Sequence, residues 1–478
     1  MKTIIDFFRQ NVENFPDKIA LIFEDRKLSY KELGGLVDSF SDSLTELEKK
    51  SVVSLFLDNS IDFVISYLGI LNAGMIVHLI PTNLTIQKIQ QQLEISNSNL
   101  LITSNHLMNK IKDIKYECRK KSFSELNIKK NDFLKSNNFY NEIAYLIFTS
   151  GTTGIPKGVS ITQCNTIFTT KNIINVLKYD ESDVNILPLP LTHSFGLGCL
   201  HTSLFLGSTL IILKNATNTC NILEQVIKHN ATTLAAVPLT LNKILNEHKN
   251  YSDYFHKLRL IITNSTSVPV KTVKEYRKIL KNGNLATYYG LTEASRSTFM
   301  IFDKSGKETS VGKPSNGIQI KIKNESSNES ETGEILIKGE NVVKNYWKNP
   351  DADKKILDNW LQTGDLGHKD SEGYLYLDGR IDDIINIAGE KVVPEDIETI
   401  VRVLIDVDDV VVVGMKNDMY GEIIKMFVKK STDGKITKSE ILAYCLKHLE
   451  SHKVPREIEF LDDFPRNEFG KIERFKLK

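Results

Sequence analysis

The amino-acid sequence predicts an α/β fold, with a large N-terminal domain of βαβ-type sheets flanked by helices and a small α+β domain at the C-terminus. Two observations carry this prediction. The chain has 478 residues, which is more than one hydrophobic core usually fills. Apolar runs of strand length also alternate with helical patterns along the larger, N-terminal part of the chain, as in parallel sheets covered by helices.

The chain opens with two predicted helices. Residues 3–14 have an amphipathic pattern that ends near Pro16, so we expect a short helix there. Ser29 and Glu32 have the spacing of a capping box, in which each side chain satisfies a backbone amide of the other residue. A second helix is therefore predicted to begin at this box.

A βαβ unit follows. Residues 52–57 and 75–80 are apolar runs of strand length, and residues 60–73 between them have a helical pattern. Such a unit builds a parallel sheet with a helix on its face. A similar rhythm returns in later strand-like runs near residues 100–102, 209–213, 233–237 and 258–263. The N-terminal part is therefore predicted to be α/β.

The C-terminal part has a different pattern. The polar run 324–331 separates strand-like segments 318–322 and 333–337, so it is predicted to be the tip of a hairpin and not a domain linker. Beyond Asp382 we expect strands near 409–414 and 422–429 and a helix near 438–449. We therefore predict domains at residues 1–381 and 382–478, the second being large enough for a small α+β lid.

Composition excludes several classes of protein. A net charge of +1 gives no sign of a nucleic-acid partner or a membrane surface. The five cysteines are scattered without CxxC spacing, so neither a disulfide framework nor a zinc site is expected. No run of about 18 uncharged apolar residues and no signal-peptide pattern is present. The predicted compartment is the reducing cytoplasm, and no transmembrane segment is expected.

A glycine-rich stretch is the strongest functional motif. It directly follows the apolar run 143–148, and its residues are Thr149, Ser150, Gly151, Thr152, Thr153, Gly154, Ile155, Pro156, Lys157 and Gly158. Glycines let backbone amides turn inward, hydroxyls add donors, and the lysine adds the charge that a polyphosphate needs. In a Walker A loop, glycine would precede the lysine and Ser or Thr would follow it. The stretch is therefore predicted to be a different phosphate cradle, the alternative being a flexible surface loop.

Four further stretches follow in order. They are Pro188-Leu189-Pro190-Leu191-Thr192-His193-Ser194-Phe195-Gly196-Leu197, Tyr288-Tyr289-Gly290-Leu291-Thr292-Glu293, Thr363-Gly364-Asp365-Leu366-Gly367 with Tyr374 to Arg380, and Pro465 to Arg474. An aromatic face suits a purine, and a carboxylate beside phosphates makes sense when a cation lies between them. Read alone, each stretch also fits an ordinary strand end, turn or surface charge. Their joint occurrence in this order is far more specific.

Together the five stretches resemble the signatures of the adenylate-forming superfamily. Its members include acyl-CoA and aryl-CoA synthetases, firefly luciferase and the adenylation domains of nonribosomal peptide synthetases. The resemblance covers nearly the whole chain. It implies that ATP and a carboxylate form acyl-AMP and pyrophosphate, and that a thiol then displaces AMP. It also implies Mg²⁺, a thiol acceptor that is CoA or the phosphopantetheine of a carrier protein, and a C-terminal domain that is mobile.

The resemblance assigns nucleotide contacts residue by residue. The glycine-rich stretch from Thr149 to Gly154, together with Lys157, would contact the phosphates. Tyr289, followed by Gly290, would stack on adenine, Thr292 would contact the α-phosphate, and Glu293 would hold Mg²⁺. Asp365 would accept both ribose hydroxyls, and Arg380 would also contact the nucleotide.

The catalytic lysine is expected in the last stretch. By resemblance, Lys471 meets the substrate carboxylate and the α-phosphate, where an ammonium reduces repulsion between two anions. Gly389 and Lys391 are placed by resemblance near the thiol tunnel. Asp382 corresponds to the hinge about which the C-terminal domain of the family swings between its two reactions.

The segment around His193 indicates which kind of acid is the substrate. In acyl-CoA synthetases an aromatic residue or histidine at this place lies beside the carboxylate and gates the pocket. Amino-acid-activating domains place an aspartate at the next position, which is Ser194 here. Because an unpaired ammonium is costly to bury, we expect an acid without an α-amino group. Asn264 to Pro269 departs from the glycine-rich turn that relatives tend to have there, which indicates a narrower or more polar pocket.

The sequence thus favours an AMP-forming acid–thiol ligase that transfers the acyl group to CoA. One alternative is a stand-alone adenylation enzyme that loads the phosphopantetheine of a carrier protein. A nucleotide sensor without catalysis is a second alternative, which the presence of Lys157, Glu293, Asp365, Arg380 and Lys471 disfavours. Formation of AMP from ATP, an acid and CoA would separate the three.

Overall fold

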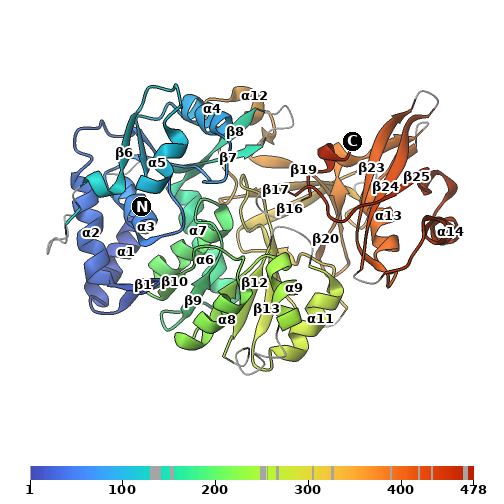
Figure 1. Ribbon diagram of the computed structural model, residues 1–478, viewed down its shortest axis with the longest axis horizontal. Helices are drawn as coiled ribbons and strands as arrows, with labels where there is room; N and C mark the ends of the chain where they lie inside the picture. The colour runs from blue at the N-terminus through green and yellow to red at the C-terminus, as the bar shows by residue number, and fades with distance from the viewer. Residues whose placement is uncertain are drawn as a thin grey trace. The chain divides into compact units, whose positions relative to one another are not determined.

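The computed structural model describes residues 2–126, 128–129, 142–150, 155–247, 255, 257–264, 268–303, 306–324, 328–387, 390–417, 420–431, 434–466 and 472–478 (Figure 1). The chain forms two compact units. The first comprises Met1–Gln319 with Ile337–Leu361, and the second comprises Ile320–Leu336 with Gln362–Lys478. Each unit is described by itself below.

The first unit contains two large sheets. One has the strand order β6 (Arg119–Ser122), β5 (Leu100–Thr103), β3 (Val52–Phe56), β4 (Ile76–Leu79), β7 (Ile143–Ser150) and β8 (Pro156–Thr162). Its first five strands are parallel, and β8 returns antiparallel to β7. The glycine-rich stretch is therefore the connection of a β7–β8 hairpin.

The other sheet has nine strands. Its order is β15 (Lys313–Pro314), β14 (Thr298–Ile301), β13 (Asn284–Tyr289), β12 (Leu260–Thr263), β11 (Thr233–Ala235), β9 (Val184–Leu187), β10 (Thr209–Ile212), β1 (Ile19–Phe23) and β2 (Arg26–Ser29). The six strands from β13 to β1 are parallel, with antiparallel strands at both edges. Strand β13 ends at Tyr289, so the stretch from Tyr288 to Glu293 leaves the sheet there.

Helices pack on both faces of these sheets. The main core joins strands of both sheets to α1 (Ile4–Asn14), α2 (Tyr30–Asp42), α3 (Ile61–Asn72), α6 (Gln163–Leu177) and α7 (Ser194–Leu206). A second core joins the six-stranded sheet to α4 (Ile86–Ser96) and α5 (Asn105–Ile111). Helices α8 (Thr219–Lys228), α9 (Pro238–Glu247) and α11 (Val270–Ile279) lie beside β12 and β13 in Figure 1. A one-turn helix, α12, spans Pro350–Asp353.

The C-terminal residues build smaller sheets. One has the order β16 (Ile318–Lys323), β17 (Gly333–Gly339), β19 (Trp360–Lys369) and β18 (Ile356–Leu357), with β20 (Leu375–Arg380) also paired to β19. Another has the order β22 (Glu390–Val392), β21 (Ile385–Ile387), β24 (Gly421–Lys430) and β23 (Val407–Asn417), with β25 (Glu457–Phe460) paired to β24.

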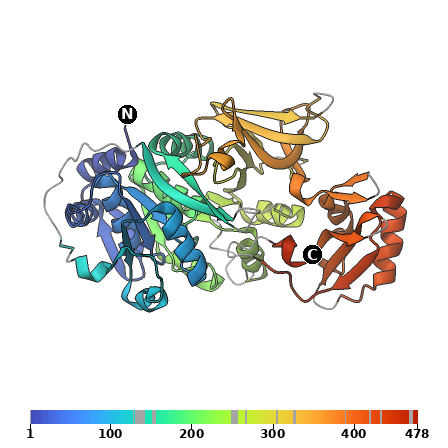
Figure 2. The same cartoon turned by 90° about the horizontal axis from the view of Figure 1, so that it is seen from above.

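The last sheet separates two apolar clusters. Its inward face packs on α13 (Pro394–Val401) and α14 (Lys438–His448) through residues that include Ile397 and Ile441. In Figure 2, α14 (red) runs alongside the strands of this sheet. The opposite face, with Val411 and Phe427, packs on Phe464, Ile472 and Leu477. The C-terminal segment is thus anchored on this second face.

The predicted elements are confirmed. Helix α1 begins after a capping box made by Thr3 and Asp6, and α2 begins after the predicted box of Ser29 and Glu32. Strands β3 and β4 with α3 form the predicted parallel βαβ unit. The polar run 324–331 connects neighbouring strands β16 and β17, although residues 325–327 lie outside the described part. The domain boundary between residues 381 and 382 stays a prediction.

All five cysteines are described, and each is a free thiol. No helix in the described ranges is long and apolar enough to cross a membrane.

Candidate active site

The β7–β8 hairpin carries the predicted phosphate cradle. Thr149 and Lys157 are directly opposite each other in the antiparallel register, so both side chains emerge on the same face of the ladder. Gly158 allows a close approach, because an added Cβ would lie 3.1 Å from Trp347 and 3.0 Å from Phe148. The Trp347 amide also donates to the Gly158 carbonyl at 2.7 Å. The predicted roles of Gly151, Thr152, Thr153, Gly154 and the Ser150 side chain fall outside what the structure describes.

The stretch from Tyr288 to Glu293 leads into a tight turn between β13 and β14. An added Cβ at Gly290 would lie 2.5 Å from the Arg296 amide nitrogen and 2.7 Å from the Ala294 carbonyl oxygen, so glycine is required by close backbone approach. The Leu291 amide donates to the Ala294 carbonyl at 3.1 Å, and the reverse bond measures 3.2 Å. This turn follows the end of β13 at Tyr289 and contains Thr292 and Glu293.

Glu293 is held by a neighbouring segment. Its carbonyl accepts from the Val343 amide at 2.9 Å, and its Oε1 accepts from the Tyr346 hydroxyl at 2.9 Å. Desolvation and the charge of Glu293 raise the pKa of Tyr346, so the hydroxyl stays protonated and remains a donor. The carboxylate is therefore oriented as an oxygen ligand.

Glu293 offers one carboxylate for the predicted Mg²⁺ site. No group of three or more His, Cys, Asp or Glu side chains that could hold a metal occurs among the described residues. Mg²⁺ commonly takes one or two carboxylates and completes its shell with waters and substrate phosphates. Glu293 therefore fits the predicted magnesium ligand, a role that stays a prediction.

His193 caps helix α7. Its Nδ1 accepts a hydrogen bond from the Phe195 amide at 3.4 Å, so the neutral ring carries its proton on Nε2. Desolvation, followed by the charge of Arg296, lowers the pKa of His193 to about 4. The ring is thus a neutral donor at physiological pH, which suits contact with a carboxylate oxygen. Ser194 is the first residue of the helix.

Two cavities lie beside this histidine segment, and Gly198, Ile173 and Arg296 line both. One also contacts Ser194 and Thr292, and the other runs along Tyr179, Phe195 and Ile262 toward the nine-stranded sheet. Both cavities are narrow, and each has room for about one water molecule. Side chains must therefore move to admit a larger acid.

Arg296 is the pocket residue that the sequence reasoning missed. It lies three residues beyond Glu293, and it has the only charged side chain that lines either cavity in the described part of the chain. The available signal was a lone arginine in the run Ala294-Ser295-Arg296-Ser297-Thr298, directly before buried β14.

In the second unit, the structure brings Asp365 and Arg380 together. They are opposite each other in the β19–β20 register, and Arg380 Nη1 lies 2.6 Å from Asp365 Oδ1. The Asp365 amide donates to Thr363 Oγ1 at 3.0 Å. Gly364 has φ +71°, a left-handed conformation that favours glycine. The predicted ribose-binding carboxylate is thus oriented by the predicted nucleotide-binding arginine, and both roles stay predictions.

The thiol-side residues are less constrained. Lys391 is exposed on β22, opposite Asn386 of β21. Asp382 is exposed in a 3₁₀ turn and lies 3.9 Å from Arg380. Gly389 lies outside the described residues. The roles of all three remain predictions.

Lys471 also lies outside the described residues, but both ends of its segment are held. Arg466 and Ile472 form an antiparallel bridge, and the Glu473 amide donates to the Pro465 carbonyl at 2.8 Å. Arg466 Nη2 lies 3.0 Å from Asp409. The residues that flank the segment of Lys471, Arg466 before it and Ile472 after it, therefore lie side by side.

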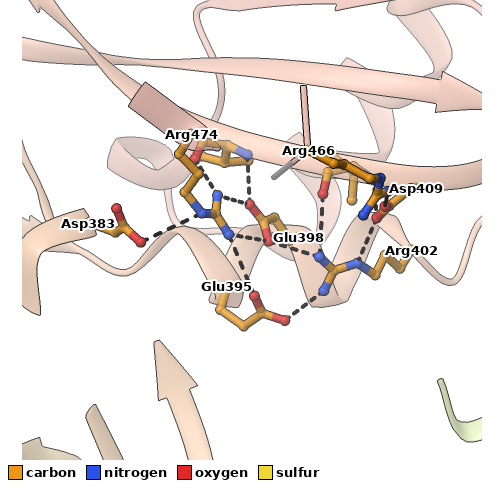
Figure 3. Close-up of polar contacts among 9 residues, drawn as sticks. Asp383, Glu395, Glu398, Arg402, Asp409, Arg466 and Arg474 are labelled. Carbon is orange, nitrogen blue, oxygen red and sulfur yellow. Dashed lines mark hydrogen bonds and ion pairs between the residues drawn. The ribbon is translucent and has the colours of Figure 1, made fainter. Parts of the chain in front are cut away.

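A buried ion-pair network anchors the far end of this segment (Figure 3). Glu398, with 0% of its side chain exposed, accepts hydrogen bonds from both Nη atoms of Arg474, from Arg402 Nη2 at 2.9 Å and from the Val412 amide at 2.7 Å. Burial raises the pKa of Glu398, but the two arginines and the amide outweigh it and hold that pKa below its ordinary value. Glu398 is therefore an ionised anchor for Arg474, three residues beyond Lys471.

Family comparisons agree with this arrangement. The model described as AMP-binding enzyme matches residues 8–347, and that described as AMP-binding enzyme C-terminal domain matches residues 396–471. Among curated proteins, a 2-succinylbenzoate–CoA ligase of Oceanobacillus iheyensis is 29% identical over 97% of this chain and 96% of its own. An oxalate–CoA ligase of Arabidopsis thaliana is 30% identical over 99% of this chain and 97% of its own.

Solved structures give the same result. The O-succinylbenzoate coenzyme A synthetase of Bacillus subtilis in complex with AMP is 27% identical, covers 99% of this chain and 98% of its own, and superimposes with a TM-score of 0.88. The fold is shared with ATP-bound MatB from Rhodopseudomonas palustris, at 23% identity, 100% and 98% coverage and a TM-score of 0.91. The chain therefore belongs to the AMP-binding enzyme family, with both the N-terminal and the C-terminal domain of that family.

Proposed function

We propose that this protein is an AMP-forming acid–CoA ligase, which activates a carboxylic acid with ATP and transfers the acyl group to CoA. The observation that carries the proposal is that each curated relative cited above is named a CoA ligase and is matched over nearly its whole length. The alignment includes both the β7–β8 hairpin and the segment around Lys471. Both predicted ATP-handling regions are thus present.

In the first reaction, an oxygen of the substrate carboxylate attacks the α-phosphorus of ATP and pyrophosphate leaves. We assign the phosphates to Thr149 and Lys157, the α-phosphate to Thr292, and charge compensation at the attacking carboxylate to Lys471. Mg²⁺ at Glu293 would supply further charge neutralisation on the phosphates. His193, as a neutral donor through Nε2, would orient one carboxylate oxygen.

The nucleoside end would be held by the second unit. Arg380 orients the Asp365 carboxylate, which would accept the ribose hydroxyls as paired hydrogen bonds. Tyr289 follows the strand and would stack on the adenine. Contacts of this kind would restrain the nucleotide, and positioning of reactants lowers the barrier to reaction.

In the second reaction, the thiol sulfur attacks the acyl carbon and the carbon–oxygen bond to AMP breaks. Lys391, exposed on β22, would lie near the thiol in this reaction. Rotation about Asp382 would bring Lys391 to the site in place of Lys471, which serves the first reaction. Free CoA is the acceptor in the names of the relatives. A carrier-protein thiol is the competing acceptor.

The direct test is to incubate the protein with ATP, Mg²⁺ and a panel of aliphatic, aryl and amino acids, with CoA or a phosphopantetheinylated carrier protein. We expect AMP and an acyl-CoA thioester with acids that lack an α-amino group, since Ser194 offers no carboxylate for an ammonium. If a thioester formed only on the carrier protein, the acceptor would be the phosphopantetheine of that carrier and not CoA. No AMP or pyrophosphate exchange with any acid would refute the proposed function.

A further inference from the structure

Arg296, in the turn between β13 and β14, has a buried guanidinium with an unusual set of partners. Its residue is 3% exposed, and its guanidinium carbon lies 4.8 Å from the centre of the Tyr288 ring. Nη1 donates to the Ser194 carbonyl at 3.2 Å and to Ser295 Oγ at 2.8 Å, and Nη2 donates to the Phe195 carbonyl at 3.1 Å. Nε is buried and has no hydrogen-bond partner in the described part of the chain.

The hydrogen-bond partners of Arg296 in the described part of the chain are all neutral. Each acceptor that these hydrogen bonds reach is a carbonyl or hydroxyl oxygen, so its charge is not balanced by them. Arg259 in the same unit shows the usual arrangement, because it forms an ion pair with Asp183, whose side chain is 2% exposed. A buried charge without a counter-ion is costly. An anion brought by a ligand would remove that cost.

Arg296 borders the space available to a ligand. Arg296 lines both cavities, and no acidic side chain lines either of them among the described residues. One cavity begins at Thr292, which we assign to the α-phosphate, so it connects the proposed reaction centre with the guanidinium. Gly198 provides room beside the cation, because an added Cβ would lie 2.3 Å from Arg296 Nη2.

We infer that the acid substrate is a dicarboxylate whose second carboxylate, the one that does not react, pairs with Arg296. The inference rests on the proposed function and names its substrate class. A planar guanidinium with an unused Nε–H matches a carboxylate, which can accept from two N–H groups at once. The residues that line the cavities between the two ends are mostly apolar or hydroxyl-bearing, which suits a short carbon spacer.

The reacting carboxylate is a poorer partner for Arg296. Adenylation converts that carboxylate into the uncharged acyl group of a mixed anhydride with AMP, so a strong ion pair to it would stabilise the substrate more than the transition state and slow the reaction. The second carboxylate keeps its charge through both reactions. Its pairing with Arg296 would therefore help binding throughout and select against monocarboxylates.

The test compares acid pairs of matched length: succinate with butanoate, glutarate with pentanoate, and adipate with hexanoate. Acid-dependent pyrophosphate exchange gives kcat/KM for each acid with the wild-type protein. We expect at least one diacid to exceed its monoacid partner by about 10²-fold or more, because a site built to bind a polar group rejects the analogue that lacks it. The monomethyl ester of each diacid serves as a control that keeps the ester oxygens but removes the second charge.

Two variants then assign the preference to Arg296. Arg296→Met removes the charge at similar length, and Gly198→Ala keeps the charge but displaces the guanidinium. Both should bring the diacid-to-monoacid ratio toward one, because exchange with the diacid should fall by a larger factor than exchange with the monoacid. Arg296→Lys should recover part of the ratio, since it restores the charge without the planar fork.

The outcomes separate this inference from the proposed function. Wild-type exchange with monoacids that equals or exceeds exchange with every diacid would overturn the dicarboxylate and leave the ligase intact. A diacid preference that survives in Arg296→Met would overturn the role of Arg296. Absence of exchange with all acids would instead count against the ligase itself.

Discussion

Replacing Glu398 by Gln should destabilise the C-terminal unit severely, because this carboxylate is the centre of its ion-pair network. The side chain is fully buried and accepts hydrogen bonds from Arg474, Arg402 and the Val412 amide. An amide of the same shape can accept from one of these donors, but its own NH₂ group would face another donor. Removing one partner of a buried ion pair costs about 3–5 kcal/mol, a large fraction of the roughly 5–15 kcal/mol that stabilises a domain.

Glu395 provides the matched control. It lies one helical turn earlier on α13 and contacts Arg402 at 2.6 Å, but its side chain is 32% exposed. Glu395→Gln should therefore cost only about 0–1 kcal/mol. Calorimetry should show the melting transition of the C-terminal unit lowered by about 10 °C or more in Glu398→Gln and by little in Glu395→Gln. Equal, small shifts in both variants would refute the reasoning.

The same substitution should affect adenylation through Arg474. At a temperature where the variant remains folded, pyrophosphate exchange should fall, because Arg474 anchors the segment that carries Lys471. A double-mutant cycle of Glu398→Gln and Arg474→Gln should give a coupling of about 0.5–3 kcal/mol in unfolding free energy. Additive effects would mean that the two side chains do not act as a pair.

The pH dependence of this stability has a definite sign. The folded-state pKa of Glu398 lies below its ordinary value of 4.5, so the unfolded chain takes up the proton first as pH falls. The stabilisation by Glu398 is thus complete above that ordinary value and is lost as pH drops through the lower, folded-state pKa. Glu398→Gln should lack this part of the acid sensitivity.

Three further predictions concern Lys471, His193 and Asp382. Lys471→Ala should slow adenylation by about 10²-fold or more while transfer from preformed acyl-AMP to thiol suffers far less; equal losses in both would remove its specific role in the first step. The His193 ring, followed by NMR, should titrate near 4, and a midpoint near its ordinary value of 6.5 would contradict the desolvation and the influence of Arg296. Asp382→Pro, which fixes φ and removes an amide donor, should cripple one half-reaction of the folded variant, and full retention of both would exclude Asp382 as the hinge.

Local patterns in the sequence were sufficient for most of the fold. The parallel strands β3 and β4 and the capping box at Ser29 depend on residues close together in the chain, where periodicity and spacing carry the information. The motif residues Thr149 and Lys157 also meet through a local hairpin. Such features could be predicted without any knowledge of tertiary contacts.

The network around Glu398 could not be predicted in this way. Glu398 and Arg474 are 76 residues apart, and their contact depends on how α13 and the C-terminal segment pack against one sheet. Arg296 was missed for a related reason. Its importance follows from burial and from the neutral character of its partners Ser194 and Phe195, which belong to a distant helix, so no spacing in the sequence marks it.

Isotope transfer tests most directly whether the substrate carboxylate itself attacks ATP to form acyl-AMP. The protein would be incubated with ATP, Mg²⁺, CoA and the most active acid labelled with ¹⁸O in its carboxylate. One labelled oxygen stays in the thioester carbonyl, and the other remains on phosphorus when the carbon–oxygen bond breaks. We predict AMP with one ¹⁸O atom and unlabelled pyrophosphate by mass spectrometry, whereas AMP without ¹⁸O would contradict the adenylate mechanism.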